Sequence, residues 1–323
     1  MIAIVGGGIA GTAIAKTLNE KEVPFLWVKN DKPSASHISS GIINPTSGRR
    51  FSLAWNYEKL RAHAISFYQE FIKPIELEKH FQPFKEGVLL KDLLEGKEEY
   101  VSTRDKEWVD VHQSFQVNVS EFLKFYSQKF AVNTLNEKFN HALLENQNNN
   151  WTYKNYTFSK VIFAEGIFVK ENPFFNYLDF RPNRGEALIL NVENFKLDKV
   201  RKYKKFICNY RGKFWVGSSF DNIDYGDPLT TDKVRNSLEE SLPFLIPKHS
   251  YNVIEHIGAI RSTTYDRKPI IGEHPEQKNL FLFNGFGTKG CSLVPYCSKM
   301  LVENILNSKL IEKELSIERI KDN

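Results

Sequence analysis

The sequence predicts an α/β fold, and three stretches of its 323 residues support this prediction. Ile2 to Val5 is an apolar run that suits a strand buried on both faces, as in a parallel sheet. A glycine-rich turn, apolar residues at helical spacing and a second apolar run, Val23 to Val28, follow. Near the other end, Leu280 to Phe283 leads to another glycine-rich turn and a helical pattern that ends near Asn307. We therefore expect both ends of the chain to contribute strands and helices.

The composition allows a large core but says little about partners. Hydrophobic residues make up 41% of the chain, which excludes wholesale disorder. The 44 basic and 39 acidic residues leave a net charge of +5, which is spread along the chain apart from the run Arg201 to Lys205. Such a mild excess bears mainly on solubility, so it is compatible with binding to RNA but does not indicate it.

The cysteines and the apolar runs bear on metal binding and location. Cys208, Cys291 and Cys297 lack metal-ligand spacing, so we expect free thiols, no disulfide and no metal site. The first residues carry no basic segment typical of a signal peptide. No window approaches the roughly 18 apolar residues that a membrane span needs. These observations predict a soluble, cytoplasmic protein with no membrane partner.

The first glycine-rich turn has the spacing G-x-G-x-x-G. Gly6 would allow the tight turn, Gly8 would let the backbone approach a pyrophosphate, and Gly11 would let the helix pack closely on the strand. The anion would lie on free N–H groups in the first turn of the helix, around Ile9 and Ala10. Between a strand and a helix, this motif strongly indicates a Rossmann-type dinucleotide-binding domain.

One position departs from the usual dinucleotide pattern. An acidic residue about 20 residues after the glycines usually accepts hydrogen bonds from the ribose hydroxyls. Alignment on the glycines places Lys29 there. Asn30 or Asp31 could take over after a small loop shift; otherwise another group must hold the ribose.

Six separated blocks, in a common order, resemble the D-amino-acid-oxidase/glycine-oxidase family. The blocks are the first glycine turn, Ser34 to Pro45, Val161 to Gly166, Arg184 to Leu190, Phe214 to Ser218, and the region Gly258 to Gly290. The resemblance implies a Rossmann-type FAD-binding domain joined to a second domain with a mixed, largely antiparallel sheet that binds the substrate.

The resemblance also implies which residues bind FAD. Ser262 to Thr264 stand where some relatives carry a cysteine that tethers the flavin, so we expect FAD to be bound without a covalent link. Lys289 could add positive charge near the flavin. The cofactor-binding residues expected are Gly6, Gly8, Ile9, Ala10, Gly11, Asn30, Ser36, Ser40, Gly41, Ala164, Gly166, Gly285, Gly287, Thr288, Lys289 and Gly290.

For the substrate, the resemblance implies that Arg261 holds a carboxylate, a task suited to the two parallel N–H groups of a guanidinium. A structural ion pair is the alternative role for Arg261. Tyr265 and Tyr210 are candidates for the pocket wall. The family's substrate-binding tyrosine aligns near Phe206, which lacks a hydroxyl, so we do not expect plain glycine as the substrate. No catalytic base is assigned.

Three functions are compatible with these residues. The first is an FAD-dependent oxidoreductase that oxidises a C–N bond of a small amino acid or secondary amine by hydride transfer to flavin; the substrate, electron acceptor and oligomeric state stay open. The second is a tRNA-modifying oxidoreductase, because Gly287 to Cys297 resembles the oxidoreductase half of a bifunctional enzyme acting on wobble uridine. The third is a non-catalytic flavin-binding relic, in which Lys29 has weakened cofactor binding.

We expect the two domains to be interleaved along the chain. Leu93 to Glu99 is predicted to be a loop, and Asn146 to Asn150 a turn between strands. The expected segments are 1–75, 115–175 and 255–323 for the FAD-binding domain, and 76–114 and 176–254 for the substrate domain.

Overall fold

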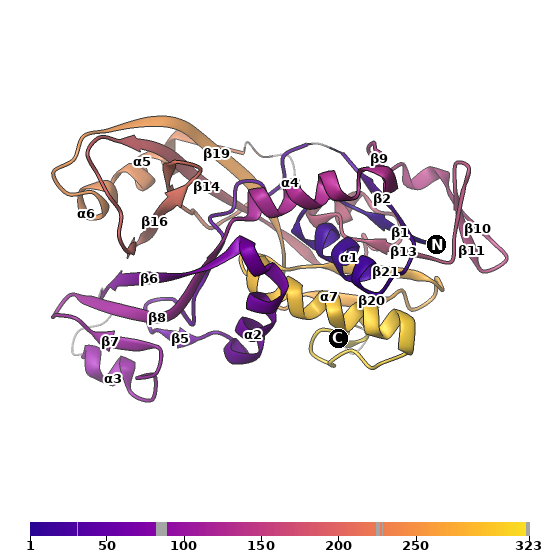
Figure 1. Ribbon diagram of the computed structural model, residues 1–323, viewed down its shortest axis with the longest axis horizontal. Helices are drawn as coiled ribbons and strands as arrows, with labels where there is room; N and C mark the ends of the chain where they lie inside the picture. Colours follow the sequence, from indigo (N-terminus) through magenta and orange to yellow (C-terminus); the bar gives the residue numbers. More distant parts are fainter. Residues whose placement is uncertain (31, 82–88, 224–226, 228, 321–323) are drawn as a thin grey trace.

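The computed structural model describes residues 1–323 except 31, 82–88, 224–226, 228 and 321–323. Two parts lie side by side, and each is built on its own sheet (Figure 1). The part at the right of Figure 1 holds both termini and the helices α1, α4 and α7. The part at the left holds the longest strands.

The first sheet has six strands in the order β20-β21-β13-β1-β2-β9. Its neighbouring strands are parallel except for β20 and β21, which are antiparallel. β1 lies between β2 and β13, and all four of its residues are buried, as the unbroken apolar run predicted. The strands are β1 (Ile2–Val5), β2 (Phe25–Lys29), β9 (Thr134–Asn136), β13 (Lys160–Phe163), β20 (Ile270–Glu273) and β21 (Leu280–Asn284).

Helices cover one face of this sheet and a small antiparallel sheet covers the other. Ile2 and Ile4 pack into the helical core, whereas Ala3 and Val5 pack into the core on the opposite face. The predicted turn at Asn146–Asn150 is confirmed, because it joins β10 to β11. The helices are α1 (Ile9–Glu20), α2 (Tyr57–Tyr68), α4 (Val119–Lys129) and α7 (Gly290–Asn307); the small sheet is β10 (Leu144–Gln147), β11 (Asn150–Tyr153) and β12 (Tyr156–Phe158).

The second sheet has ten strands and is mixed but largely antiparallel, as predicted. Its order is β18-β14-β17-β16-β15-β6-β8-β3, with β19 beside β14 and β7 beside β8. Among the described residues, β15 and β6 are its only parallel pair. The strands are β3 (Ile42–Ile43), β6 (Ile72–His80), β7 (Val101–Thr103), β8 (Trp108–Val117), β14 (Phe180–Val192), β15 (Val200–Tyr203), β16 (Lys205–Tyr210), β17 (Lys213–Gly217), β18 (Asp221–Asn222) and β19 (Tyr251–Thr264).

The remaining elements are short. A hairpin joins β4 (Thr46–Ser47) to β5 (Ser52–Leu53), and α5 (Asp232–Glu239) and α6 (Leu242–Leu245) pack on the second sheet. In the part of the chain that the structure describes, no helix is long and apolar enough to cross a membrane. The 3-10 helices are Gln69–Phe71, Ala131–Asn133, His141–Leu143, Gly166–Glu171 and Ile317–Ile320.

Two expectations need adjustment. The predicted loop at Leu93–Glu99 is helical at its start, because α3 (Leu90–Leu94) buries Leu94 against the second sheet's core. The expected domain boundaries at residues 75, 115 and 255 fall inside β6, β8 and β19, which are all strands of the second sheet. We therefore propose a division that keeps these three strands whole in the substrate domain and resumes the FAD-binding domain after Thr264.

Candidate cofactor and substrate site

The glycine turn after β1 brings strand and helix unusually close together. Gly6 has a φ of +121°, and a Cβ there would lie 2.2 Å from the carbonyl oxygen of Ala164. A Cβ at Gly11 would lie 2.0 Å from the oxygen of Gly6. Gly8 is the N-cap residue of α1 and, as a glycine, has no side chain that could cap the helix. The turn therefore leaves N–H groups of the first helical turn available to an anion.

The small-residue segment after β2 crosses this helix end and leads to the second sheet. The Ile9 N–H donates a hydrogen bond to the Ser36 hydroxyl at 3.0 Å. A Cβ on Gly8 would lie 3.2 Å from the same oxygen. Gly41 has a φ of +73°, and a Cβ there would lie 1.9 Å from the oxygen of Val117. Each close approach requires the small residue found at that position.

The second glycine turn brings the start of α7 to the start of α1. Gly285 and Gly287 have φ values of +85° and +51°, and the Gly287 N–H donates to the oxygen of Ser262 at 3.0 Å. A Cβ on Gly290 would lie 3.6 Å from Ile9. Neither helix has an acidic residue in its first turn, and neither N-cap residue, Gly8 or Lys289, caps its helix through its side chain. Two positive helix ends thus converge, an arrangement that fits the pyrophosphate of a dinucleotide.

Two further cofactor-binding candidates lie at the end of β13. Ala164 is buried, and its N–H donates to the oxygen of Val5 at 2.7 Å. Gly166 has a φ of +58°, and its oxygen accepts a hydrogen bond from the Asn284 side chain at 2.8 Å. These bonds tie the carboxyl ends of three strands of the first sheet together.

At the ribose position, Lys29 lies directly beside the glycine turn. A Cβ on Gly7 would lie 3.1 Å from the Cβ of Lys29, and the Lys29 ammonium lies 5.3 Å from the centre of the Trp27 ring. The Asn30 side-chain oxygen accepts a hydrogen bond from the Lys32 N–H at 3.2 Å. Asp31, the other substitute for the acid, lies outside the described residues. In the structure, too, a lysine lies beside the glycine turn where the dinucleotide pattern usually has an acidic residue.

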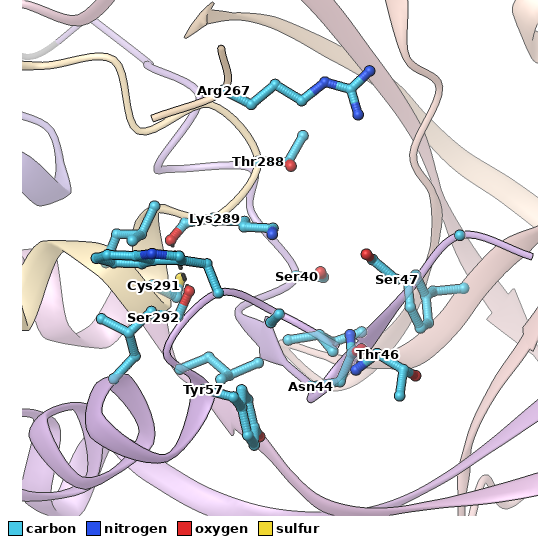
Figure 2. A pocket seen from close by; sticks show the side chains of 18 of the residues that line it. Ser40, Asn44, Thr46, Ser47, Tyr57, Arg267, Thr288, Lys289, Cys291 and Ser292 are labelled. Carbon is cyan, nitrogen blue, oxygen red and sulfur yellow. Dashed lines mark hydrogen bonds between the residues drawn. The ribbon is translucent and has the colours of Figure 1, made fainter. Parts of the chain in front are cut away.

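A cavity of about 260 Å³ opens between the start of α7, the segment after Gly41 and one face of the second sheet. Figure 2 shows Ser40, Thr288 and Lys289 around this space. Trp215 and Phe206 of the second sheet line it as well. The Thr46 hydroxyl is buried at the cavity and has no hydrogen-bond partner among the described residues.

The charged side chains lining this cavity are all cationic: Lys202, Arg267, Lys268 and Lys289. No aspartate or glutamate in the described part of the chain lines it. Lys268 forms an ion pair with Glu314, whereas the other three form none with any described residue. Burial, and then the charge of Arg267, lowers the pKa of Lys289. The cavity is thus electrostatically suited to an anionic ligand.

Arg261 lies beside the cavity on β19. One terminal nitrogen donates to the Asn183 side chain at 2.8 Å and to the oxygen of Ser219 at 3.3 Å. The other donates to the hydroxyl of Ser218, a cavity residue, at 2.7 Å. A Cβ on Gly185 would lie 1.7 Å from the guanidinium, so Arg261 lies flat against β14. No carboxylate of the described residues forms an ion pair with it, and burial lowers its pKa.

The comparison with known families agrees with this geometry. The sequence matches the family model described as "DAO: FAD dependent oxidoreductase" over residues 92–304, well over half of the chain. The chain belongs to the DAO family. Members of this family are FAD-binding flavoproteins, so FAD is the dinucleotide that the convergent helix ends fit.

Two curated proteins illustrate the relationship of this DAO chain. It is 24% identical to the tRNA 5-methylaminomethyl-2-thiouridine biosynthesis bifunctional protein of Marinobacter nauticus, over 97% of this chain and 57% of that protein. It is 23% identical to Bacillus subtilis glycine oxidase, over 50% of this chain and 44% of that protein. The chain thus spans little more than half the length of the first relative, and the match to the second is shorter still.

Solved structures of DAO-type enzymes share the fold. Glycine oxidase from Geobacillus kaustophilus superposes with a TM-score of 0.76 at 18% identity, covering 96% of this chain and 95% of that chain. Iminodiacetate oxidase from Chelativorans sp. BNC1 superposes with a TM-score of 0.77 at 14% identity, covering 98% of both chains. At such identities the likeness establishes the fold alone.

The structure places the predicted substrate-binding tyrosines of this DAO chain away from the cavity. Tyr265 follows the last paired residue of β19; its ring is 76% exposed and lies 4.8 Å from the guanidinium of Arg181. Tyr210 is half-buried and its hydroxyl donates to the oxygen of His37 at 2.9 Å. Neither tyrosine lines this cavity, which corrects the expectation that they form its wall. Phe206 and Trp215 line it instead.

Cys208, Cys291 and Cys297 are free and buried. Cys291 lines the cavity, and burial raises the pKa of its thiol to about 12, so it is neutral near pH 7. Over the described ranges, no group of three or more His, Cys, Asp or Glu side chains is arranged to hold a metal ion.

Proposed function

We propose that this protein oxidises a C–N bond of a small carboxylated amine or amino acid. The coarser statement, an FAD-dependent oxidoreductase of the DAO family, follows from the family match. Structural neighbours named for glycine and for iminodiacetate oxidation support the finer one, since both names denote amines that bear carboxylates. Arg261 is the observation on which the proposal rests.

Arg261 supports a carboxylate-binding role because no carboxylate of the described residues is bonded to it directly; the charge of Asp221 acts on it only without a hydrogen bond or ion pair. Its hydrogen bonds to described residues go to neutral groups, namely the Asn183 amide, the Ser218 hydroxyl and the Ser219 carbonyl. A buried cation without a direct carboxylate partner is costly, and a substrate carboxylate would supply that partner in paired hydrogen bonds. The alternative role, a structural ion pair, has no carboxylate partner among the described residues.

The chain's own residues would position and shield the reacting groups. FAD, held by the glycine turns and the starts of α1 and α7, supplies the two-electron acceptor for a hydride from the carbon next to nitrogen. Trp215 and Phe206 would exclude water from the cavity, and Arg261 would fix the substrate's orientation. The N–H groups at the start of α7, together with Lys289, would stabilise negative charge at the flavin. No residue is assigned as a base.

Removing the Arg261 guanidinium tests the proposal. We expect Arg261→Ala to raise KM for a carboxylated amine by about 100-fold or more, since a charged paired hydrogen bond contributes roughly 3 kcal/mol, while the flavin content stays unchanged. Arg261→Lys should recover only part of the loss. Arg181→Ala, which removes an exposed arginine from the same sheet, is the control. An unchanged KM in Arg261→Ala would remove Arg261 from this role.

A tRNA substrate is the second candidate. The match to the tRNA 5-methylaminomethyl-2-thiouridine biosynthesis protein extends over 97% of this chain, and the cationic cavity is compatible with an anionic group of the substrate. If this function applies, total tRNA from cells lacking the gene should show an altered modified-nucleoside profile by mass spectrometry. Identical profiles with and without the gene would exclude it.

A further inference from the structure

One row of side chains crosses the inner face of the second sheet, which faces the cavity. The strand registers pair Ala187 with Gly217, Gly217 with Phe206, Phe206 with Lys202, and Lys202 with Lys79. Directly paired residues point to the same face of a sheet. Lys202 and Lys79 therefore extend side by side from β15 and β6 toward the face that carries Phe206.

Each of the two ammonium groups lies against an aromatic ring. The Lys202 ammonium lies 4.3 Å from the centre of the Phe206 ring and lines the cavity. The Lys79 ammonium lies 3.9 Å from the centre of the buried Phe51 ring and donates to the carbonyl of Gly48, another cavity residue. Lys79 is 6% exposed. Lys202 thus reaches the cavity, and Lys79 lies directly behind it.

No acidic group compensates these charges within the described residues. Glu78 and Asp110 belong to neighbouring strands, but they are paired with each other in register on the opposite face. There Glu78 binds Arg104 and Arg201, and Asp110 binds Lys199. Burial, and then the charge of Lys202, lowers the pKa of Lys79 to about 7, and burial lowers the pKa of Lys202 to about 8.

Such a pair is unfavourable unless something anionic joins it. Two adjacent cations repel each other, and each has lost much of its hydration. Cation–π contacts recover only part of that loss. The Lys202 ammonium makes no hydrogen bond to any described residue, so its three donors are available to a ligand in the cavity.

We propose that Lys202, supported by Lys79, forms a second anion-binding subsite in the cavity that takes a carboxylate or phosphate group of the substrate. The inference rests on the proposed function, because it assumes that Arg261 holds the first carboxylate. Four strand spacings of roughly 4.8 Å separate β19 from β15 in the sheet order. The two subsites therefore suit anionic groups at opposite ends of one molecule.

Calorimetric titration of the FAD-loaded protein tests this subsite with matched probes. Dodecanedioate has a carboxylate at each end of a long chain, and dodecanoate has the same chain length but only one. We expect dodecanedioate to bind at least about tenfold more tightly than dodecanoate, because it gains a second charged contact. Lys202→Met should abolish this difference, whereas Lys202→Arg should keep most of it. Lys196→Met, which removes a highly exposed lysine, should match the unmodified protein.

Binding of inorganic phosphate distinguishes a failure of this subsite from a failure of the proposed role of Arg261. Phosphate binding should persist in Arg261→Ala and weaken at least about tenfold in Lys202→Met. This result would support the subsite even if Arg261→Ala left KM unchanged. Lys79→Met provides a second route to the same test, and thermal unfolding of each variant verifies that it is folded. The proposal is overturned if folded Lys202→Met and Lys79→Met both bind dodecanedioate and phosphate as the unmodified protein does.

Discussion

At the residue scale, the position of Arg261 depends on a missing methyl group. Gly185 lies on β14 two residues after Asn183, which pairs with Arg261 on β19. A Cβ on Gly185 would lie 1.7 Å from the Arg261 guanidinium. Its backbone does not have a positive φ, so the glycine is needed for space and not for its conformation. The flat arrangement in turn lets Arg261 reach Ser218 at the cavity.

We expect Gly185→Ala to raise KM for a carboxylated substrate by about tenfold or more without loss of flavin, because the displaced guanidinium loses its paired geometry. Steady-state kinetics and the flavin absorbance of the same sample provide both readouts. Ala259→Gly changes the cross-strand partner of Gly185 by one methyl group and should leave KM nearly unchanged. An unaltered KM in Gly185→Ala would contradict the importance of this geometry.

At the element scale, the contact between α1 and the turn after β1 determines whether the dinucleotide can be held. Gly11 lies in the first turns of α1, and a Cβ there would be 2.0 Å from the oxygen of Gly6. That oxygen also accepts a hydrogen bond from the Trp27 indole at 2.8 Å. An added methyl group would push the helix start away from the strand and spread the N–H groups that receive the pyrophosphate.

Gly11→Ala should therefore purify with much less FAD, at most about a tenth of the normal flavin-to-protein ratio, because the close approach required by this motif is lost. The ratio follows from the visible and ultraviolet absorbance of the purified protein. Gly7→Ala in the same turn is the control, since its Cβ would lie 3.1 Å from the Lys29 Cβ and 3.4 Å from the Asn30 oxygen, far milder contacts than the one at Gly11. Full flavin occupancy in Gly11→Ala would contradict this role for α1.

A second element, the hairpin of β15 and β16, separates the side chains of the basic run at residues 201–205. In the structure, strand alternation directs Arg201 to Glu78 on one face and Lys202 to the cavity on the other. Lys204 is exposed, with a φ of +52° between the two strands. The run is thus divided among an ion pair, a turn and the cavity.

At the scale of the whole molecule, burial of Lys79 makes stability depend on pH. Its pKa falls from an ordinary value of 10.5 to about 7 on folding, chiefly through burial. Between these values the unfolded chain holds a proton that the folded chain lacks, so stability rises with pH in that window. Below about pH 7 both states are protonated, and the folded protein bears the full cost of the buried charge.

Lys79→Met should therefore raise Tm at pH 6, by about 2 °C or more, and the gain should shrink toward pH 10. Thermal unfolding followed by circular dichroism at the two pH values measures both differences. Lys196→Met, on the surface, should change Tm little at either pH. A lower Tm for Lys79→Met at pH 6 would mean that the ammonium stabilises the fold, contrary to the argument from burial.

Local patterns predicted much of the fold. The apolar runs identified β1 and β21, and the glycine spacing identified the starts of α1 and α7, because each depends on neighbours in sequence. Lys202 and Arg267 could not be recognised in this way. Their positions depend on the pairing of β15 with β6 and on the turn after β19, which only the assembled sheets determine. Tyr265 was misplaced for the same reason.

The central claim, that this chain is an active flavoenzyme for small carboxylated amines, is tested most directly by the visible absorption spectrum. The purified protein would be measured without oxygen, before and after addition of amino acids and N-substituted glycines. We predict a flavin spectrum that bleaches with at least one of these compounds. A flavin spectrum that none of them bleaches, or a colourless protein that takes up no added FAD, would contradict the claim.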